Sequence, residues 1–359
     1  MLLYQMTHMK KNIFYFTPYY PPDNNAAAIR NYWFVKTLKE DEQNVQLVTG
    51  NDLLFKLPKN TDSAIKRLWK EQLAGIALFF KVLSSKHDLY FFSSPPFITI
   101  LLGSLACRIT KRRYILDIRD IYPEVFLHLG LLKEDSPIYK FILGLTKKMY
   151  KSADSIITVS KGLQNKIRNH SPESKVELIY NGYDSDLFKP NPNKFEKYTI
   201  VFHGNLGKFQ RIDLLVEVAR LMEKSHPDIQ FKVIGYGPGE KHLQNPPSNL
   251  EYLGLMKYED IASYIAKCHM GISLRTDDEI SREALPVKVF EYIGVGIPVI
   301  VTPQGEASEL VENKKLGSTA KNKAQKIIQK ILETKRINIG SVDNFSRQAQ
   351  SQKVTSIII

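Results

Sequence analysis

Residues 282–302 read REALPVKVFEYIGVGIPVIVT and carry the clearest structural signal in the chain. Pro286 suits the first turn of a helix, which we expect to run to about Val295. Gly296 supplies a helix stop, and Pro298–Thr302 follows as a short apolar run that is typical of a buried strand. A helix that leads directly into a buried strand is half of a repeating α/β unit.

The same alternation of short apolar runs with segments of helical length extends along the chain, and it predicts parallel sheets covered by helices. Between two series of such runs lies NGYDSDLFKPNPNKFEK (181–197), whose Asn, Asp, Pro and Lys content is typical of a connection between domains. The predicted strands are Asn12–Phe16, Val45–Thr49, Asp88–Phe92, Tyr114–Ile118, Ser155–Val159, Val176–Ile179, Tyr198–His203, Gln230–Ile234, Leu250–Leu253, Met270–Leu274 and Pro298–Thr302.

These runs predict two α/β domains, residues 1–185 and residues 186–340. We expect the polar tail at about 341–359 to pack back on the first domain. A length of 359 residues is enough for two buried cores. With 43% hydrophobic and 24% charged residues, the composition excludes a disordered chain.

Cysteine usage and hydropathy indicate a cytosolic protein. Cys107 and Cys268 lie far apart in sequence, which argues against a disulfide framework or a cysteine-based zinc site. Apolar runs such as Ala74–Phe80 are much shorter than the roughly 18 residues that span a bilayer. No secretory signal is expected at the N-terminus, and Met9 is an alternative start.

The formal net charge is +13, and more of the excess lies in the N-terminal half. Such a charge favours an anionic partner: nucleic acid, a phosphorylated small molecule or an acidic membrane surface.

The helix expected after Pro286 carries the chemistry-bearing residues. Ligands of open parallel sheets bind beyond the carboxyl ends of the strands, near helix N-termini. Glu283 lies just before this helix and Glu291 about five residues inside it. Lys288 lies in the first turn, where a cation is unfavourable for the helix dipole but suits a bound anion. The alternative is an ordinary surface helix, with Glu283 and Lys288 solvated and Glu291 in a local ion pair.

This segment resembles the E-x7-E motif of the retaining glycosyltransferases of group 1, also called family 4, and other segments match that family in order. The resemblance implies an α/β fold of the GT-B type, with two Rossmann-like domains facing across a cleft. DIRDIYPE (117–124) and GNLGKFQ (204–210) are similar to the branch that transfers N-acetylated deoxyhexosamines of the fucosamine type in bacterial surface polysaccharide synthesis. The other matching segments are FTPYYPPDNNAAAIR (16–30), SSPPF (93–97), ADSIITVSKGL (153–163), ELIYNGYDSDLFKP (177–190), FHGNLGKFQRIDLL (202–215), VIGYGPGEKHL (233–243) and LPVKVFEYIGVGIPVI (285–300).

The resemblance assigns roles around the donor, which is expected to be a UDP-linked sugar. Glu291 would bind the ribose hydroxyls, and Glu283 the hydroxyls of the sugar near its anomeric carbon. Lys288, with the backbone N–H groups of the helix that starts at Pro286, would bind the diphosphate. Many members have Ser where this chain has Val287, so one phosphate hydrogen bond is either missing or supplied by the backbone.

The loop GNLGKFQR (204–211) departs further from the family. Members commonly have Arg and Lys at the positions of Asn205 and Gln210. Lys208 and Arg211 either replace those cations on the diphosphate or are solvated. Gly204 and Gly207 would let the backbone approach the phosphates, although a simple strand-to-helix turn would also use glycine. Gly235, in the next donor-domain loop, is a further donor-binding candidate.

In the N-terminal domain, Asn25 and Ala26 belong to a loop that replaces the Gly-Gly of many members. Arg30, one helical turn on, either faces the cleft or is a surface arginine. Arg119 and Asp120 stand where relatives carry a His-Asp pair, so no histidine-based catalysis is expected. Asp120 is the candidate for acceptor or sugar contact, with pairing to Arg119 as the alternative.

No cofactor or essential metal is expected, and the nucleotide-sugar is a co-substrate. The eight histidines form no metal-ligand cluster in sequence, and His203 is predicted to be a partly buried structural residue. The acidic run Asp277–Glu279 lacks the context of a metal-binding DxD triad, and we expect a flexible, solvated loop there.

Residues 64–86 have the composition of an interfacial helix, with Leu68, Leu73, Ile76, Phe79, Phe80 and Leu83 near one side and lysines and arginines around them. A buried Rossmann helix has a similar pattern. We expect peripheral contact with an anionic membrane on the cytoplasmic face, with Lys140–Lys151 as an extension of that surface. The expected acceptor is a lipid-linked glycan on a carrier such as a polyprenyl diphosphate.

Two other functions stay open. A GT-B nucleotide-sugar epimerase would use the same donor without an acceptor. A nucleic-acid-binding protein would explain the charge, but it would need aromatic residues among clustered arginines, and this chain has no such motif.

Overall fold

The computed structural model describes residues 10–23, 25–55, 57, 64–128 and 130–358. The alternative start at Met9 therefore lies outside the described residues. The chain divides into two compact units: unit 1 comprises Met1–Asn181 and Gln350–Ile359, and unit 2 comprises Gly182–Ala349. The division falls four residues before the predicted boundary, and the last ten residues are part of unit 1.

Unit 1 contains a six-stranded parallel sheet in the order β2-β1-β3-β4-β5-β6. Its strands are β1 (Asn12–Thr17), β2 (Asn44–Thr49), β3 (Leu89–Ser93), β4 (Tyr114–Ile118), β5 (Ser155–Thr158) and β6 (Val176–Leu178). Its helices are α2 (Ala26–Glu40), α3 (Ala64–Ser84), α4 (Phe97–Ile109), α5 (Glu124–His128), α6 (Pro137–Ser152) and α7 (Lys161–His170), together with most of α14 (Arg347–Ile358).

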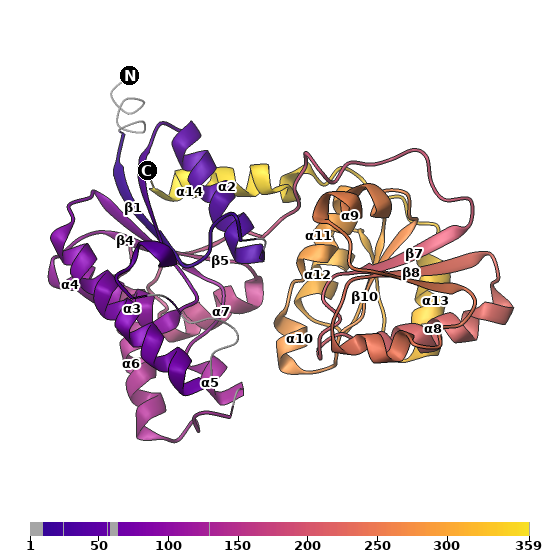
Figure 1. Cartoon of the computed structure of the whole chain (residues 1–359), viewed down its shortest axis with the longest axis horizontal. Helices are drawn as coiled ribbons and strands as arrows, with labels where there is room; N and C mark the ends of the chain where they lie inside the picture. The colour runs from indigo at the N-terminus through magenta and orange to yellow at the C-terminus, as the bar shows by residue number, and fades with distance from the viewer. Residues whose placement is uncertain (1–9, 24, 56, 58–63, 129, 359) are drawn as a thin grey trace. The chain divides into compact units, whose positions relative to one another are not determined.

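Alternate side chains of each strand point to opposite faces of this sheet, and both faces are covered (Figure 1). Phe14 and Phe16 of β1 belong to a core built with α3, α4, α6 and α7. Ile13 and Tyr15 belong to a second core built with α2 and α14. The near-continuous apolar strands predicted from the sequence follow from this double coverage.

Unit 2 contains a second six-stranded parallel sheet, in the order β12-β11-β10-β7-β8-β9. Its main core lies between the sheet and helices α8 and α13. The strands are β7 (Tyr198–His203), β8 (Ile229–Ile234), β9 (Leu250–Gly254), β10 (Met270–Ser273), β11 (Val299–Val301) and β12 (Gly317–Thr319). The helices are α8 (Ile212–Ser225), α9 (Tyr258–Ile265), α10 (Glu279–Glu283), α11 (Val287–Gly294), α12 (Glu306–Asn313) and α13 (Ala324–Thr334).

Every predicted strand is present, with each end within one residue of its prediction, and the prediction of two α/β domains is confirmed. The sequence analysis missed β12, because Gly317–Thr319 is a three-residue edge strand without an apolar run. The strand order reverses at β1 in unit 1 and at β7 in unit 2, and such switch points are the usual ligand sites of open parallel sheets. No helix within the described residues is both long and apolar enough to cross a bilayer.

Candidate functional site

The candidate site lies in unit 2, where β7 and its sheet neighbour β10 end beside the N-terminus of α11. Gly204 directly follows β7 and has φ +115°, a conformation that favours glycine. Pro286 is the N-cap residue of α11 and supplies no side-chain cap. Val289 donates to the carbonyl oxygen of Pro286, whereas the N–H groups of Val287 and Lys288 precede the first hydrogen bonds of the helix and can bind an anion.

Lys288 is a buried cation at this helix terminus, only 9% exposed. Its Nζ lies 3.7 Å from the centroid of the Phe202 ring and donates a 3.3 Å hydrogen bond to Oε1 of Gln210. A Cβ added to Gly204 would lie 3.4 Å from the same Nζ, so the glycine backbone and the amine are neighbours. Among the described residues, no carboxylate pairs with Lys288.

Burial and, to a smaller extent, the positive charge of Arg275 lower the pKa of Lys288 to about 7, although the charge of Glu291 opposes this shift. Without an anion, the amine is therefore close to half protonated at neutral pH. A bound phosphate would favour the charged form.

Glu291 is held in a polar cluster under α11 and is 4% exposed. Its Oε1 accepts a 2.6 Å hydrogen bond from the Tyr258 hydroxyl, which also accepts a 3.0 Å hydrogen bond from Arg347. Its Oε2 lies 3.3 Å from Nε2 of His203. The alternative of an ordinary surface helix is wrong, because all residues of α11 from Lys288 to Gly294 are buried.

His203 is 4% exposed, and burial, followed by the Lys288 charge, lowers its pKa to about 3. It is therefore a neutral, packed side chain, as predicted. Within the described residues, no cluster of three or more His, Cys, Asp or Glu side chains could hold a metal ion.

Glu283 is the last residue of α10 and is half-buried. The expected solvated loop at Asp277–Glu279 is shorter than predicted, because Asp277 and Glu279 are exposed but Glu279 already begins α10. The Asp278 carboxylate caps α10 by accepting a 2.8 Å hydrogen bond from the backbone N–H of Ser281, and Asp277 forms a 2.8 Å ion pair with Arg282. These local contacts hold the segment that leads to α11.

Lys208 and Arg211, the two cations suggested for the loop after β7, differ from Lys288 in their contacts. Nζ of Lys208 lies 4.9 Å from the centroid of the Phe209 ring. Arg211 forms a 2.7 Å ion pair with Asp213, and the hydrogen bond to Asp213 is the largest cause that raises the pKa of Arg211. The Asp213 carboxylate therefore already neutralises the charge of Arg211.

Sequence reasoning missed Arg275, which follows β10. Its Nε is buried and has no hydrogen-bond partner among the described residues, and its charge acts on Lys288. The signal for it in the sequence is a cation just after the predicted strand Met270–Leu274, whose position beside the switch strand β7 only the structure shows.

Gly235 fixes how closely the loops after β7 and β8 approach. It has φ +140°, and a Cβ at this position would lie 1.9 Å from the carbonyl oxygen of Gly204. The Asn205 side chain lies against the same turn, since a Cβ at Gly237 would be 2.9 Å from its Oδ1. Glycine is required here by backbone contact rather than by a simple turn.

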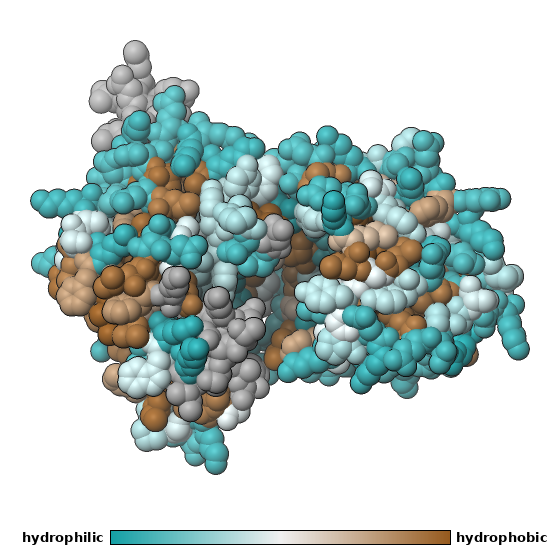
Figure 2. All heavy atoms as spheres, in the orientation of Figure 1, coloured by the Kyte–Doolittle hydropathy of each residue, from teal (hydrophilic) through white to brown (hydrophobic). Residues whose placement is uncertain are grey.

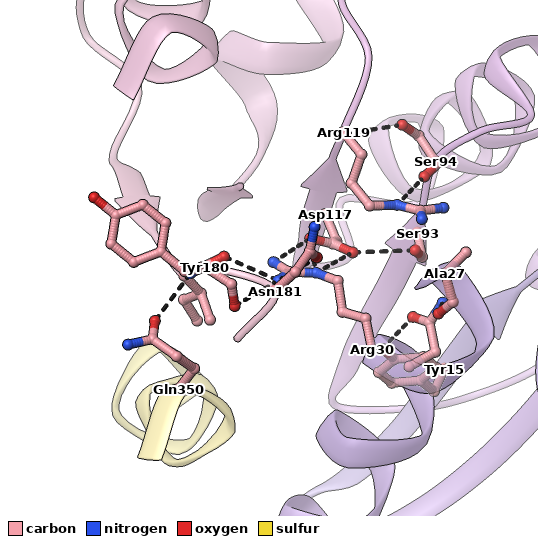
Figure 3. A network of polar contacts seen from close by, with 12 residues as sticks. Tyr15, Ala27, Arg30, Ser93, Ser94, Asp117, Arg119, Tyr180, Asn181 and Gln350 are labelled. Atoms are coloured by element: carbon pink, nitrogen blue, oxygen red, sulfur yellow. Dashed lines mark hydrogen bonds and ion pairs between the residues drawn. The ribbon is translucent and has the colours of Figure 1, made fainter. Parts of the chain in front are cut away.

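The candidate residues of unit 1 lie near the carboxyl ends of β1, β3 and β4, and Figure 3 shows the contacts of two of them, Arg30 and Arg119. Arg30 is 3% exposed and forms a buried ion pair with Asp117 at 2.9 Å. Its Nη1 donates to the carbonyl oxygens of Ile179 and Tyr180. The alternative of a surface arginine is therefore wrong, because the guanidinium of Arg30 is used inside unit 1.

Arg119 and Asp120 do not form the pair that was considered. Nε of Arg119 donates a 2.7 Å hydrogen bond to the carbonyl oxygen of Ser94 (Figure 3). Asp120 is exposed after β4, and no described residue bonds to its carboxylate. Asn25 caps α2 by accepting a 2.9 Å hydrogen bond from the N–H of Ala28, while Ala26 is exposed.

The chain is similar to known glycosyltransferases. A model of glycosyl transferases group 1 matches residues 184–352, and a model of glycosyltransferase family 4 matches residues 28–187. The chain is 20% identical over 327 residues to the "probable glycosyltransferase WbjE" of Pseudomonas aeruginosa, which covers 85% of this chain and 81% of that protein. It is 21% identical over 181 residues to the amylovoran biosynthesis glycosyltransferase AmsK of Erwinia amylovora, which covers 47% of this chain and 44% of that protein.

Solved structures with the same architecture include the lipopolysaccharide outer core galactosyltransferase WaaB in its apo form. The TM-score is 0.67 at 11% identity, over 97% of this chain and 99% of that one. The UDP-GlcNAc 2-epimerase of Methanocaldococcus jannaschii gives a TM-score of 0.59 at 13% identity, over 98% and 99% of the two chains.

The fold is therefore GT-B, with two Rossmann-like domains. The two matched models, which together run from residue 28 to residue 352, and the curated relatives identify the chain as a glycosyltransferase.

Proposed function

We propose that this enzyme is a retaining glycosyltransferase that moves a sugar from a UDP-linked donor to a lipid-linked glycan in the synthesis of a bacterial surface polysaccharide. The observation that carries the proposal is Lys288, a buried amine at the N-terminus of α11 that no carboxylate within the described part of the chain pairs with. A diphosphate supplies the missing negative charge. The names of AmsK and WaaB support a polysaccharide or lipopolysaccharide product.

The proposed chemistry is a same-face displacement at the anomeric carbon. The bond from that carbon to the diphosphate oxygen breaks, the acceptor hydroxyl oxygen forms the new bond, and the hydroxyl proton passes to the departing phosphate. Lys288 and the first N–H groups of α11 stabilise the charge that develops on the leaving group. Glu291 binds the ribose and Glu283 the donor sugar, an N-acetylated hexosamine or deoxyhexosamine. Asp120 is the proposed acceptor or sugar contact in unit 1, and no metal takes part.

A panel of nucleotide-sugars tests this proposal, because a bound donor raises the melting temperature by mass action. We expect UDP-linked N-acetylated sugars to stabilise the wild-type enzyme and to yield a glycan on a polyprenyl-diphosphate-linked acceptor. Glu291→Gln and Glu283→Gln should each reduce kcat/KM by roughly 10- to 100-fold, the effect of losing a hydrogen bond to a charged group. Glu259→Gln, at an exposed position of α9, is the matched control and should leave transfer unchanged.

Product analysis separates transfer from epimerisation. An epimerised free nucleotide-sugar without any glycan product would replace the transferase reaction with that of an epimerase. Wild-type turnover in both glutamate variants would refute the assignment of the donor site.

An exposed apolar surface on α3 supports a membrane partner, and in Figure 2 brown side chains gather over this part of unit 1. Ala74, Leu78 and Val82 of α3 are fully buried, and Phe79 and Leu83 pack against the same core. The expected single apolar side is therefore divided in two. The α3 surface consists of the exposed residues Leu68, Trp69, Leu73, Ile76 and Phe80.

The α3 surface predicts binding to vesicles of mixed zwitterionic and anionic phospholipid. Trp69 and Phe80 are each 62% exposed, and burying an aromatic side chain contributes about 1.5–3 kcal/mol. Trp69→Ser combined with Phe80→Ser should therefore weaken co-sedimentation by at least about tenfold. Leu221→Ser with Leu255→Ser removes two exposed apolar residues of unit 2 and should have no such effect. Equal losses in the two double variants would contradict a specific membrane surface on α3.

A further inference from the structure

The backbone of Arg275 is fixed where β10 ends beside β7. Its N–H donates a 3.1 Å hydrogen bond to Oγ1 of Thr302, and its carbonyl oxygen accepts a 2.7 Å hydrogen bond from Nδ2 of Asn322. Arg275 also forms an antiparallel bridge with Gln210. The guanidinium therefore starts from a rigid backbone position at the switch point of the sheet.

The guanidinium itself has little to bind. Its central carbon lies 5.8 Å from the centroid of the Phe209 ring, and its buried Nε makes no hydrogen bond within the described residues. The charge of Asp278 favours its protonated form. That carboxylate is occupied by the Thr276 hydroxyl and the Ser281 N–H, and it forms no ion pair with Arg275.

Gln210 contacts both Arg275 and Lys288. The Gln210 backbone bridges to Arg275, while its side-chain oxygen accepts the hydrogen bond from Lys288. The two cations repel each other strongly enough for Arg275 to be the largest electrostatic influence on Lys288. Two partly or fully buried cations without a shared carboxylate are unfavourable unless an anion of high charge density lies between them.

We propose that Arg275 is a second donor-binding cation, which holds the diphosphate of the nucleotide-sugar together with Lys288. This inference rests on the proposed function and adds a residue to it. Arg275 contributes the forked, bidentate geometry suited to phosphate oxygens, while Lys288 contributes a point charge at the helix terminus. Lys208 and Arg211, the other cations of this region, are not needed in that role.

Calorimetric titration with UDP, uridine and inorganic pyrophosphate tests the pair. Arg275→Gln should weaken UDP binding by roughly 10- to 100-fold, the range for a lost hydrogen bond to a charged group, and should leave uridine binding unchanged. The UDP affinity of Arg275→Lys should lie between that of Arg275→Gln and that of the wild type. Arg211→Gln is the matched control, since it also removes an arginine near the loop after β7 but one that is already paired with Asp213.

Proton uptake gives a second readout that a merely structural arginine would not change. At pH 8 the Lys288 amine is mostly neutral in the free enzyme, because its pKa is about 7, and it takes up a proton when a diphosphate binds. The charged groups that act on it are Arg275 and Glu291, and the Lys288 charge in turn helps to lower the pKa of the neighbouring His203. Removing Arg275 raises the pKa of Lys288, so Arg275→Gln should take up fewer protons per bound UDP, measured by titration in buffers of different ionisation enthalpy.

The outcomes separate the two proposals. Equal UDP affinity in wild type and Arg275→Gln would overturn the role of Arg275 and leave the transferase intact. A wild-type enzyme that binds neither UDP nor pyrophosphate would overturn both. Binding of pyrophosphate that Arg275→Gln weakens, without any binding of UDP or other nucleoside diphosphates, would support the cation pair and overturn the nucleotide donor.

Discussion

Replacing Lys288 with methionine is expected to lower kcat/KM for sugar transfer by about 100- to 1,000-fold, the usual effect of removing one donor that stabilises a leaving charge. Methionine keeps the length and the apolar stem of the side chain, so the contact with the Phe202 ring is retained. Only the charge and the hydrogen bond to Gln210 are lost. Transfer and UDP binding, measured on the same preparation, check this expectation.

The same substitution should not destabilise the fold. Because the pKa of Lys288 is lowered to about 7, the unfolded chain binds more protons at this group than the folded one between about pH 7 and its ordinary pKa of 10.5. Lys288 therefore makes wild-type stability rise with pH across this window, and below it the buried charge is fully unfavourable. Lys288→Met removes that dependence and should melt no lower than the wild type at pH 6.

Lys208→Met is the control, since Lys208 is a loop cation in contact with the Phe209 ring. It should retain transfer within a few-fold of the wild type. Comparable losses in Lys288→Met and Lys208→Met would mean that general positive charge, rather than the buried amine, binds the donor.

The fold could be predicted well because its signals are local and redundant. Strands such as Tyr198–His203 and Tyr114–Ile118 are buried on both faces, so each appears as an apolar run with no need for the partner strands. β12 carries no such signal, since only its pairing with β11 makes Gly317–Thr319 a strand.

The candidate site was predictable only where one segment contains the whole feature. In the sequence, Pro286 marks the start of α11, and Lys288 follows in the first turn, where a cation is unfavourable for the helix dipole. Lys288 could therefore be identified from the sequence. Arg30 and Arg275 could not be assigned from sequence, because each role depends on a partner far along the chain. Arg30 meets Asp117, 87 residues away, and Arg275 shares Gln210 with Lys288. The charge of a residue is visible in sequence, but the presence of a matching partner is not.

The exposed surface of α3 could not be predicted from sequence for the same reason, because it depends on a partner elsewhere in the chain. Helical spacing predicted that the apolar residues of α3 lie on one side. The face that is buried is set instead by where the neighbouring helix α4 allows a close approach. Gly103 of α4 lies so close to Leu78 that an added Cβ would be 2.9 Å from its side chain. This contact selects Ala74, Leu78 and Val82 for the core and leaves Trp69 and Phe80 exposed. A sequence pattern gives the number of apolar residues, while packing decides which of them remain on the surface.

Asp117→Ala is expected to lower the free energy of unfolding by about 3–5 kcal/mol, the effect of leaving a buried charge without its partner. Asp117 is fully buried at the end of β4 and accepts hydrogen bonds from Nε and Nη2 of Arg30 and from the Ser93 hydroxyl (Figure 3). Arg30 also holds the carbonyl oxygens of Ile179 and Tyr180, where the chain leaves unit 1. Denaturant unfolding measures the loss.

Two variants show whether burial is the cause of this effect. Asp154→Ala removes the carboxylate of the Arg113–Asp154 ion pair, in which the side chains are 55% and 31% exposed, and such pairs contribute at most about 1 kcal/mol. Arg30→Met combined with Asp117→Leu removes both charges and should recover most of the lost stability, because buried ion pairs are often replaceable by apolar residues of similar volume. If Asp117→Ala were no more harmful than Asp154→Ala, the ion pair would contribute nothing beyond an exposed one, and Arg30 would be free for another role. If the double variant were as unstable as Asp117→Ala, the hydrogen bonds from Arg30 to Ile179 and Tyr180 would be the stabilising contacts, rather than the neutralisation of Asp117.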